Sequence, residues 1–339
     1  MPPASAPDLA VLIGRFQPFH WGHLRLLESA LVVAPRALVV VGSAAGPRLA
    51  KNPFTEAERI DAITASLTPE QRARVSFVGV RDYYDEPRWA AAVKAAVRRA
   101  TPGPIALIGF RKDESSNYLS SFPEWSEHAL PRQAPIDGTA LRRAYFTHPG
   151  PELAPELLAA VPPAVANFLR KFRSNSEFER LREEWLSLEV NRQKYGTGLS
   201  VTVDSLVTAA GHVLLVQRGH APCKSLWALP GGFLEGSERL LSGALRELAE
   251  ETRIACSDAD LRAAFRSVVV FDHPERSQRG RTITHVHYFA LSGAPPPVQG
   301  ADDALAARWF PLAEVASMSR ELCEDHFQIV DHFLSIARD

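Results

Sequence analysis

Residues 14–23 (GRFQPFHWGH) constrain the fold more than any other part of this chain of 339 residues. An apolar run over residues 9–13 leads into this stretch, and apolar residues at helical spacing, beginning at Leu24, follow it. The pattern predicts a strand, a tight turn and a helix, with the loop at the carboxyl end of the strand. A helix that begins near Gly22 directs its free N–H groups and its positive dipole end at the loop, which suits a phosphate.

Two histidines in this stretch are candidate ligand contacts. His20 and His23 lie one helical turn apart, so both imidazoles can face the same bound anion. Gly14 and Gly22 would let a ligand approach the backbone closely. A histidine pair near a helix start is also common at ordinary surface positions, so the pair alone does not settle the function.

Composition excludes several classes of protein. Hydrophobic residues make up 46% of the chain and charged residues 23%, which is typical of a globular protein. The formal net charge of −1 gives no basic field, so we expect no nucleic-acid partner. No apolar run approaches the roughly 20 residues that span a bilayer, so we expect no membrane association. Residues 1–8 lack the layout of a signal peptide, which predicts a cytoplasmic protein.

The cysteines are few and far apart. Cys223, Cys256 and Cys323 are odd in number and widely spaced. We therefore expect isolated thiols in a reducing compartment, with neither a disulfide framework nor a zinc site.

The first part of the chain alternates between strand and helix patterns. Apolar runs at 37–42, 75–80 and 104–109 follow the first strand, and helical patterns separate them, one starting after Thr55 and one covering 89–97. This order predicts a doubly wound parallel α/β sheet with ligands at the carboxyl ends of its strands.

The later part changes character twice. Residues 151–195 carry helical spacing and dense charge, which predicts two or three bridging helices ending at Gly196-Thr197-Gly198. Beyond them, strand patterns surround a long helix over residues 237–252, and a closing helix is expected over 321–336. We therefore expect a first α/β domain (1–150), a helical bridge (151–198) and a second α/β domain (199–339).

Residues 14–23 resemble the G-R-F-x-P-x-H-x-G-H motif of the nucleotidylyltransferase superfamily, in the form found in archaeal-type nicotinamide mononucleotide (NMN) adenylyltransferases. The resemblance extends in order through Gly42-Ser43, residues 51–55, Glu58-Arg59, Asp82, Trp89 and residues 138–142. This family transfers the adenylyl group of ATP to NMN, giving NAD and pyrophosphate. Such a reaction depends on the alignment of phosphates and on positive charge near them.

The resemblance implies a role for each matching residue. His20, His23 and Arg142 would contact the reacting phosphates. ATP and phosphate would also meet Gly14, Arg15, Phe16, Lys51, Gly138 and Thr139. NMN would meet Ser43, Asn52, Asp82 and Trp89. Substrate oxygens and water would hold most of a Mg²⁺ ion, so no cage of carboxylates is expected.

A second motif lies at residues 232–251. Gly232, Glu238, Arg246, Glu247, Glu250 and Glu251 have the spacing G-x5-E-x7-R-E-x-x-E-E, which resembles the Nudix box. On a helix the last three glutamates share one face, where a divalent cation would relieve their repulsion. The resemblance implies hydrolysis of a nucleoside diphosphate derivative by metal-activated water.

The same resemblance implies roles in the second domain. Gly232, Glu247, Glu250 and Glu251 would hold Mg²⁺ (Mn²⁺ as an alternative), with Glu250 and Glu251 catalytic. Arg246 would orient the glutamates, and Glu238 would brace the fold or assist the metals. Glu275 is the first candidate for an additional base, Asp272 the second, and Arg218 and Trp227 are candidates for substrate contact. Arg253 replaces the glycine that usually ends the box helix, which raises a question about local geometry.

Both domains occur fused in this order in bacterial bifunctional NMN adenylyltransferase/ADP-ribose pyrophosphatases, and the chain resembles them over nearly its entire length. The substrates implied are ATP, NMN and ADP-ribose, the last cleaved to AMP and ribose 5-phosphate. Three alternatives stay open: a second domain that senses ADP-ribose or a dinucleotide without hydrolysis, a DNA-binding regulator, and another nucleotidyl-transfer substrate. The sequence leaves the oligomeric state open, a homo-oligomer included.

Overall fold

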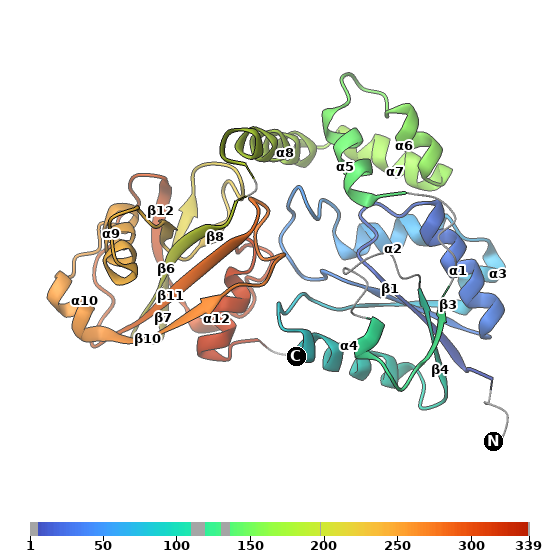
Figure 1. Cartoon of the computed structure of the whole chain (residues 1–339), viewed down its shortest axis with the longest axis horizontal. Helices are drawn as coiled ribbons and strands as arrows, with labels where there is room; N and C mark the ends of the chain where they lie inside the picture. Colours follow the sequence, from blue (N-terminus) through green and yellow to red (C-terminus); the bar gives the residue numbers. More distant parts are fainter. Residues whose placement is uncertain (1–5, 110–118, 130–135, 197, 338–339) are drawn as a thin grey trace. The chain divides into compact units, whose positions relative to one another are not determined.

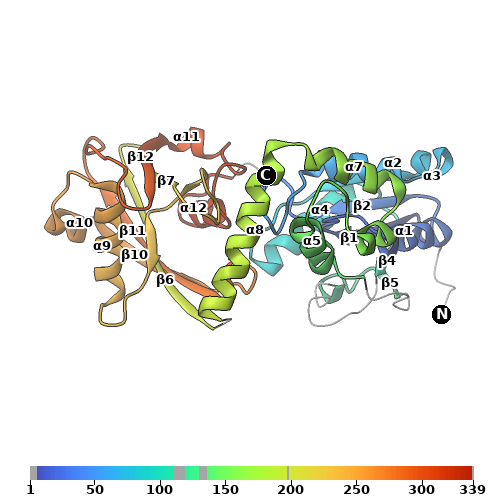
Figure 2. The same cartoon turned by 90° about the horizontal axis from the view of Figure 1, so that it is seen from above.

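The computed structural model describes residues 6–109, 119–129, 136–196 and 198–337 (Figure 1). The chain divides into two compact units, Met1–Arg182 and Glu183–Asp339. The division falls inside α8 (Ser176–Tyr195), an unbroken helix of 20 residues (Figure 2). Within the described residues, none of the helices has the length and apolar character to cross a membrane.

The first unit contains an all-parallel sheet with strand order β3-β2-β1-β4-β5. Its strands are β1 (Leu9–Gly14), β2 (Ala37–Val41), β3 (Val75–Gly79), β4 (Ile105–Gly109) and β5 (Ser126–Ala129). The first four confirm the predicted strands, whereas β5 was not predicted because it is short and polar. The strand order reverses beside β1, so the loop after Gly14 lies at the switch point where such sheets bind ligands.

The helices of this part of the chain are α1 (Trp21–Val33), α2 (Glu56–Ala65), α3 (Pro69–Arg74), α4 (Glu86–Ala100) and α5 (Gly138–Thr147). The predicted cap at Thr55 is confirmed: its side chain accepts from the Glu58 N–H, and the Glu58 carboxylate accepts from the Thr55 N–H. Val93 and Val97 of α4 belong to one core with Val11 of β1. The chain adds β2 and β3 on one side of β1 and then crosses to add β4 on the other side. Because the connections between parallel strands are right-handed, α1 lies on the opposite face of the sheet from α4.

Three helices follow, as predicted for residues 151–195: α6 (Pro155–Ala160), α7 (Pro163–Arg173) and α8. The paired prolines account for the start of α7, since Pro162 is its N-cap and Pro163 its first residue. Tyr145 at the end of α5 packs against Phe178 of α8, with ring centroids 5.1 Å apart.

The second unit is built on a mixed sheet with strand order β10-β11-β6-β7-β12. Its strands are β6 (Ser200–Ala209), β7 (His212–Arg218), β8 (Trp227–Ala228), β9 (Gly231–Phe233), β10 (Phe265–Phe271), β11 (Thr282–Leu291) and β12 (Ala304–Pro311). The hairpin between β6 and β7 turns at Ala210 and Gly211, which both have positive φ.

Helices pack on both faces of this sheet: α9 (Leu240–Thr252), α10 (Asp258–Ala264), α11 (Leu312–Val315) and α12 (His326–Leu334). Leu245 and Leu248 of α9 share a core with Val207 of β6, while Leu206 shares another core with Val330 of α12. Neighbouring residues of β6 therefore face opposite helical layers, so the predicted second α/β domain has an α/β/α arrangement. The closing helix begins at His326 and not near Glu321.

Two of the cysteines are joined, so the expectation of three isolated thiols is wrong. Cys223 and Cys323 form a disulfide with their Cα atoms 5.5 Å apart, although 100 residues separate them. Trp227 brings them together, because its N–H donates to Glu321 O (2.9 Å) and its carbonyl accepts from the Cys323 N–H (2.8 Å). No spacing rule in the sequence reveals this pairing. Cys256 keeps a free thiol.

The structure shows how α9 ends with Arg253 in place of the usual glycine. This residue adopts the left-handed conformation (φ 42°, ψ 39°), and its N–H donates to Ala249 O at 3.0 Å. The helix therefore ends as it would with glycine, at the cost of backbone strain in an L-residue.

We expect Arg253→Gly to raise the free energy of unfolding of the second unit by about 0.5–1 kcal/mol, because relief of strain exceeds the added entropy of the unfolded chain. Urea denaturation measures this change. Arg253→Ala is the matched control, since it removes the side chain but keeps the strain. Equal stabilisation by both variants would contradict the explanation.

Candidate functional sites

The first site is the loop between β1 and α1, where two imidazoles lie face to face. His20 is the N-cap of α1 and makes no side-chain capping bond. Its ring stacks on His23 with centroids 3.6 Å apart and planes inclined by 21°. The Nδ1 atoms of both rings are buried and have no hydrogen-bond partner. The loop therefore holds two buried imidazole nitrogens whose hydrogen-bonding capacity is not used by the described residues.

Burial determines the charge of this pair. Desolvation lowers the pKa of His20 to about 4, although the nearby Asp137 carboxylate opposes the shift. Desolvation also lowers the pKa of His23 well below its ordinary value, and His20 adds to the effect. At neutral pH both rings are uncharged, so each carries one N–H donor and one acceptor.

Aromatic rings support the histidines from below. Phe16 is buried with a positive φ of 52°, and its ring meets that of His23 edge-on at 4.9 Å. A Cβ atom on Gly14 would lie 2.9 Å from the Phe16 ring, so the glycine provides room for it. The edge-on contact with Phe16 thus helps to orient the His23 imidazole.

Arg142 reaches this loop from α5. Its guanidinium donates to Gln17 O at 2.8 Å and to Thr139 Oγ1 at 3.1 Å. The Thr139 N–H is already bonded to the Asp137 carboxylate at 2.7 Å, so part of the expected anion-binding helix terminus is occupied by a cap. Gly138, the first residue of α5, lies against Arg142 and Gln17 O.

The expected NMN contacts come from the carboxyl ends of β2 and β3. Ser43 Oγ donates to Asp82 Oδ2 at 2.6 Å, which brings two of the four candidates together. Asn52 Oδ1 is buried without a partner. Trp89 is half-buried and packs edge-on against Phe122 at 5.8 Å. Lys51 and Arg15 lie in the loops after β2 and β1.

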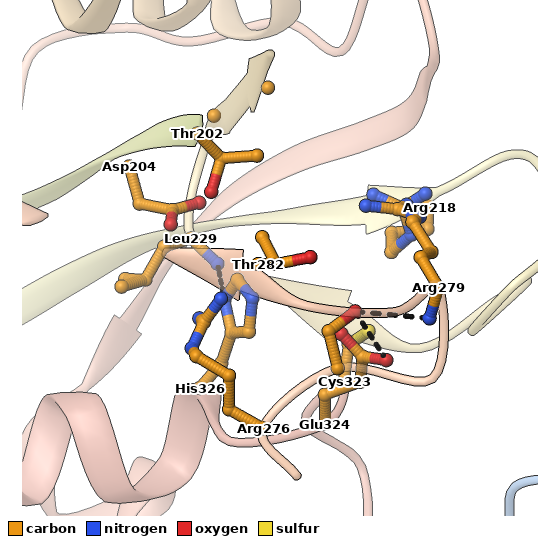
Figure 3. Close-up of a pocket in the computed structure, with 13 residues that line it drawn as sticks. Thr202, Asp204, Arg218, Leu229, Arg276, Arg279, Thr282, Cys323, Glu324 and His326 are labelled. Atoms are coloured by element: carbon orange, nitrogen blue, oxygen red, sulfur yellow. Dashed lines mark hydrogen bonds between the residues drawn. The ribbon is translucent and has the colours of Figure 1, made fainter. Parts of the chain in front are cut away.

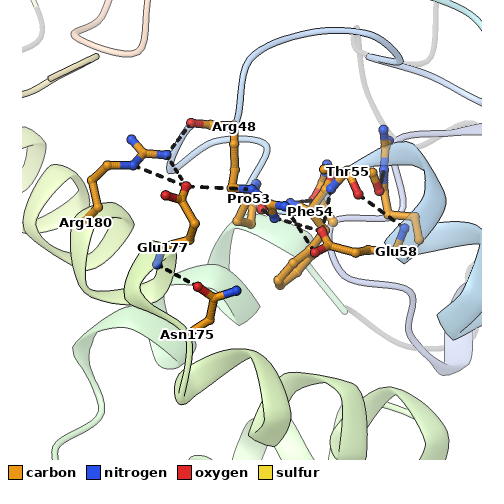
Figure 4. A network of polar contacts seen from close by, with 10 residues as sticks. Arg48, Pro53, Phe54, Thr55, Glu58, Asn175, Glu177 and Arg180 are labelled. Carbon is orange, nitrogen blue, oxygen red and sulfur yellow. Dashed lines mark hydrogen bonds and ion pairs between the residues drawn. The ribbon is translucent and has the colours of Figure 1, made fainter. Parts of the chain in front are cut away.

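The loop that carries Asn52 is held by an ionic network (Figure 4). Arg48 donates to Glu58 through both terminal nitrogens, at 2.8 and 3.1 Å. Glu177 of α8 lies 3.8 Å from Arg48 and accepts from Arg180, which also donates to Arg48 O at 2.9 Å. The sequence did not reveal the two partners from α8, because Glu177 and Arg180 lie more than a hundred positions from Arg48.

The second site is formed by β9 and α9. Gly231 N–H donates to Glu251 Oε2 at 2.9 Å. A Cβ atom on Gly232 would lie 2.6 Å from Glu247 Oε1, so only glycine lets this carboxylate approach the strand. The two glycines set the distance between the strand and the acidic face of the helix.

Arg246 contacts three of the candidate carboxylates. It donates to Glu238 at 2.6 and 3.1 Å, to Glu247 at 2.9 Å and to Glu250 at 3.0 Å. Glu251 lies apart from this group, on Gly231. Among the described residues, His, Cys, Asp and Glu side chains do not gather in a group of three that could hold a metal as they stand.

The pKa values of these carboxylates are nevertheless those expected of a site that a bound cation would stabilise. Burial raises the pKa of Glu251 to about 8, and the charges of Glu247 and Asp204 add to the shift. Burial also raises the pKa values of Glu247 and Asp204. Carboxylates that resist ionisation when alone are stabilised by a bound divalent ion.

A pocket adjoins this acidic cluster (Figure 3). Gly231, Gly232 and Asp204 line one part of it, and Arg218, Arg276 and Arg279 line another. Arg276 is bound to the buried Asp325 at 2.8 and 3.0 Å. The combination of carboxylates and arginines is suited to a metal-bound diphosphate.

Comparison with known proteins agrees with both sites. Residues 11–100 match the cytidylyltransferase-like family model, and residues 198–333 match the NUDIX domain model. The nicotinamide/nicotinic acid mononucleotide adenylyltransferase of Acinetobacter baylyi is 35% identical over 181 residues, covering 52% of this chain and 93% of its own length. The ADP-ribose pyrophosphatase of Methanocaldococcus jannaschii is 30% identical over 135 residues, covering 40% and 73%.

One solved structure covers both halves. A bifunctional NMN adenylyltransferase/ADP ribose pyrophosphatase from Francisella tularensis is 33% identical, with a TM-score of 0.88 over 97% of this chain and 99% of its own. This chain belongs to the same bifunctional family. A second structure from Francisella tularensis, 32% identical with the same coverage and TM-score, contains AMP and a Mn ion.

The predicted extra base of the Nudix half lies outside the pocket lining. Glu275 is half-buried, and its N–H donates to His273 Nδ1 at 3.1 Å, while Asp272 is exposed. Glu324 lines the pocket instead and accepts from the Gln278 N–H at 2.6 Å. Trp227 packs edge-on against Phe310 at 4.7 Å, in the core around β8.

Glu184 of α8 also belongs to the Nudix half, which the sequence did not indicate. Its carboxylate is buried, with 1% of the residue exposed, and accepts from the Cys223 N–H at 3.1 Å and from Gln278 Nε2 at 2.9 Å. Gln278 neighbours Arg279, so Glu184 fixes the segment that carries two of the pocket arginines. A glutamate within a dense run of charges gives no sign of this burial.

The lowered pKa of His20 predicts how the first unit responds to acid. An unfolded chain takes up a proton near pH 6.5, and the folded chain only near pH 4. The unfolded state therefore binds more protons between these values, and the free energy of unfolding falls as the pH decreases through this range. His20 accounts for up to about 3 kcal/mol of the loss.

Urea denaturation across this pH range tests the effect, with His20→Gln expected to show a shallower decline. His148→Gln, in the same unit but half-exposed, is the control. Parallel curves for the wild type and His20→Gln would show that His20 does not contribute.

Proposed function

We propose that the protein transfers the adenylyl group of ATP to NMN, giving NAD and pyrophosphate, and hydrolyses ADP-ribose to AMP and ribose 5-phosphate. The observation that carries the first activity is the stacked His20–His23 pair, with unpartnered Nδ1 atoms at the switch point of the sheet. The second activity rests on the Nudix glutamates beside an arginine-lined pocket. Because the chain belongs to the bifunctional family, we assign both activities to it.

In the first reaction, the protein aligns two phosphates and stabilises developing charge. The neutral imidazoles of His20 and His23 donate to phosphate oxygens of ATP, and Arg142 supplies the positive charge. We place NMN beside Asp82 and Trp89, with Asn52 Oδ1 available to its polar groups. Gly14, Arg15, Lys51 and Thr139 border the phosphates.

In the second reaction, the pocket arginines bind the diphosphate of ADP-ribose. Glu247, Glu250 and Glu251 would hold a divalent ion beside Gly232, and we propose Mg²⁺ with Mn²⁺ as a substitute. Such an ion, when bound, activates water and neutralises phosphate charge. Glu238 and Arg246 hold the glutamates in position, and Glu275 stays our candidate for the base.

The chemistry requires small-molecule substrates alone, so we propose no nucleic-acid or membrane partner, and the cytoplasm as the location.

One structural feature favours a second candidate function, a Nudix unit that binds ADP-ribose without cleaving it. Arg246 already forms ion pairs with Glu247 and Glu250, so a metal must compete with an internal cation. Incubation of the purified chain with Mg²⁺ and ADP-ribose decides between the two functions. AMP as product supports the hydrolase, whereas ADP-ribose bound but uncleaved would make the unit a sensor.

Single substitutions should separate the activities. We expect His20→Ala to lower kcat for NAD formation by about 100-fold or more, because a phosphate contact in the transition state is lost, and to leave ADP-ribose hydrolysis intact. Glu250→Gln should produce the reverse pattern. Product assays by chromatography measure both reactions on each variant. Equal loss of both activities in either variant would contradict independent sites.

Glu184→Gln should lower kcat/KM for ADP-ribose on the order of tenfold, mainly through KM, because the arginine segment loses its buried acceptor. NAD formation by the same protein should not change. Glu183→Gln is a close control, since among the described residues its exposed side chain contacts only Lys224, at 3.4 Å. A loss in kcat alone, or an equal effect of Glu183→Gln, would argue against a positioning role.

A further inference from the structure

A cavity of about 460 Å³ lies in the first unit, away from every residue assigned to either reaction. The end of α5, the last turn of α7 and the first turns of α8 form it. Arg170, Arg173, Arg182 and Glu179 supply the charged groups of its lining. The volume is within the range of about 300–1,000 Å³ that is usual for small-molecule sites.

The lining carries an excess of positive charge. In the part of the chain that the structure describes, Arg173 donates only to the carbonyl oxygens of Glu152 and His148, and Arg170 only to Asn167 Oδ1 at 3.2 Å. Within the described residues, neither guanidinium has a carboxylate partner. Arg182 lies 3.8 Å from Glu179, the single carboxylate of the lining. Three guanidinium groups and one carboxylate leave two positive charges unbalanced.

Two of the three arginines in this lining are already held in position without a ligand. The guanidinium of Arg173 lies over the rings of Tyr145 and Phe178, at 5.8 and 5.1 Å, while its N–H groups are directed by two backbone carbonyls. The Nε of Arg182 donates to Phe146 O at 3.1 Å. Arginines held in this way lose little conformational freedom when an anion binds.

We propose that this cavity binds a small molecule through a doubly charged phosphate group. Guanidinium forks match phosphate oxygens, and two unbalanced positive charges match a dianion. The phosphate can belong to a monoester or to a pyrophosphate, and the experiment separates these two sources.

Calorimetric titration of the full chain with inorganic pyrophosphate, and separately with ribose 5-phosphate, tests the proposal at constant ionic strength without divalent metal. We expect Arg170→Glu to weaken one binding event at least tenfold. Lys171→Glu makes the same charge change at the next position of α7, exposed and outside the cavity. It should change the affinity less than twofold.

Arg182→Gln, on a different helix, should weaken the same event. The ligand whose affinity the two arginine variants lower more identifies the source of the phosphate. Equal weakening by Arg170→Glu and Lys171→Glu, or no weakening by either arginine variant, would overturn the proposal. Because no cavity residue is assigned to catalysis, the result is independent of both proposed activities.

Discussion

The first site depends on one buried guanidinium. Arg59 is 2% exposed and donates to the carbonyl oxygens of Arg15, Gly42, Ser43 and Thr55, at 2.7, 2.6, 3.2 and 3.2 Å. Burial lowers its pKa to about 10, so the group still carries its charge at neutral pH. These carbonyls belong to the loops after β1 and β2 and to the cap of α2. Each would cost about 1–3 kcal/mol if left buried without a donor, which makes Arg59 the common support of all three segments.

The same support extends to the histidines. Gln17 exchanges two hydrogen bonds with the backbone of Phe54, at 2.9 and 3.0 Å. The loop that carries His20 is therefore attached to the Asn-Pro-Phe segment as well as to Arg59. Rigid loops allow two imidazoles to stay stacked and uncharged, with their Nδ1 atoms buried and in place before a substrate binds.

The Nudix half solves a different electrostatic problem. The Nudix box brings several carboxylates close together. Their mutual repulsion must be reduced by other groups when no metal ion is bound. Arg246 donates to Glu238, Glu247 and Glu250 and reduces their repulsion, while Glu251 resists ionisation, with its pKa raised to about 8. A metal that binds here therefore displaces both an arginine contact and a proton, which makes its affinity dependent on pH.

Local patterns explain how much of this could be predicted. The buried strands, the cap at Thr55 and the box helix each follow from residues within one element. The disulfide, the partners of Glu184 and the pocket arginines depend on contacts between distant segments, which periodicity does not encode.

The helix α8 shows the difference most clearly. Glu177 and Glu184 lie in one run of charges, and the sequence analysis assigned both to the helical bridge. Glu177 is partly exposed and pairs with Arg48, whereas Glu184 is buried against backbone and amide donors. Their roles diverge because the face of a helix that becomes buried is decided by what packs on it, and α8 meets a different partner in each unit.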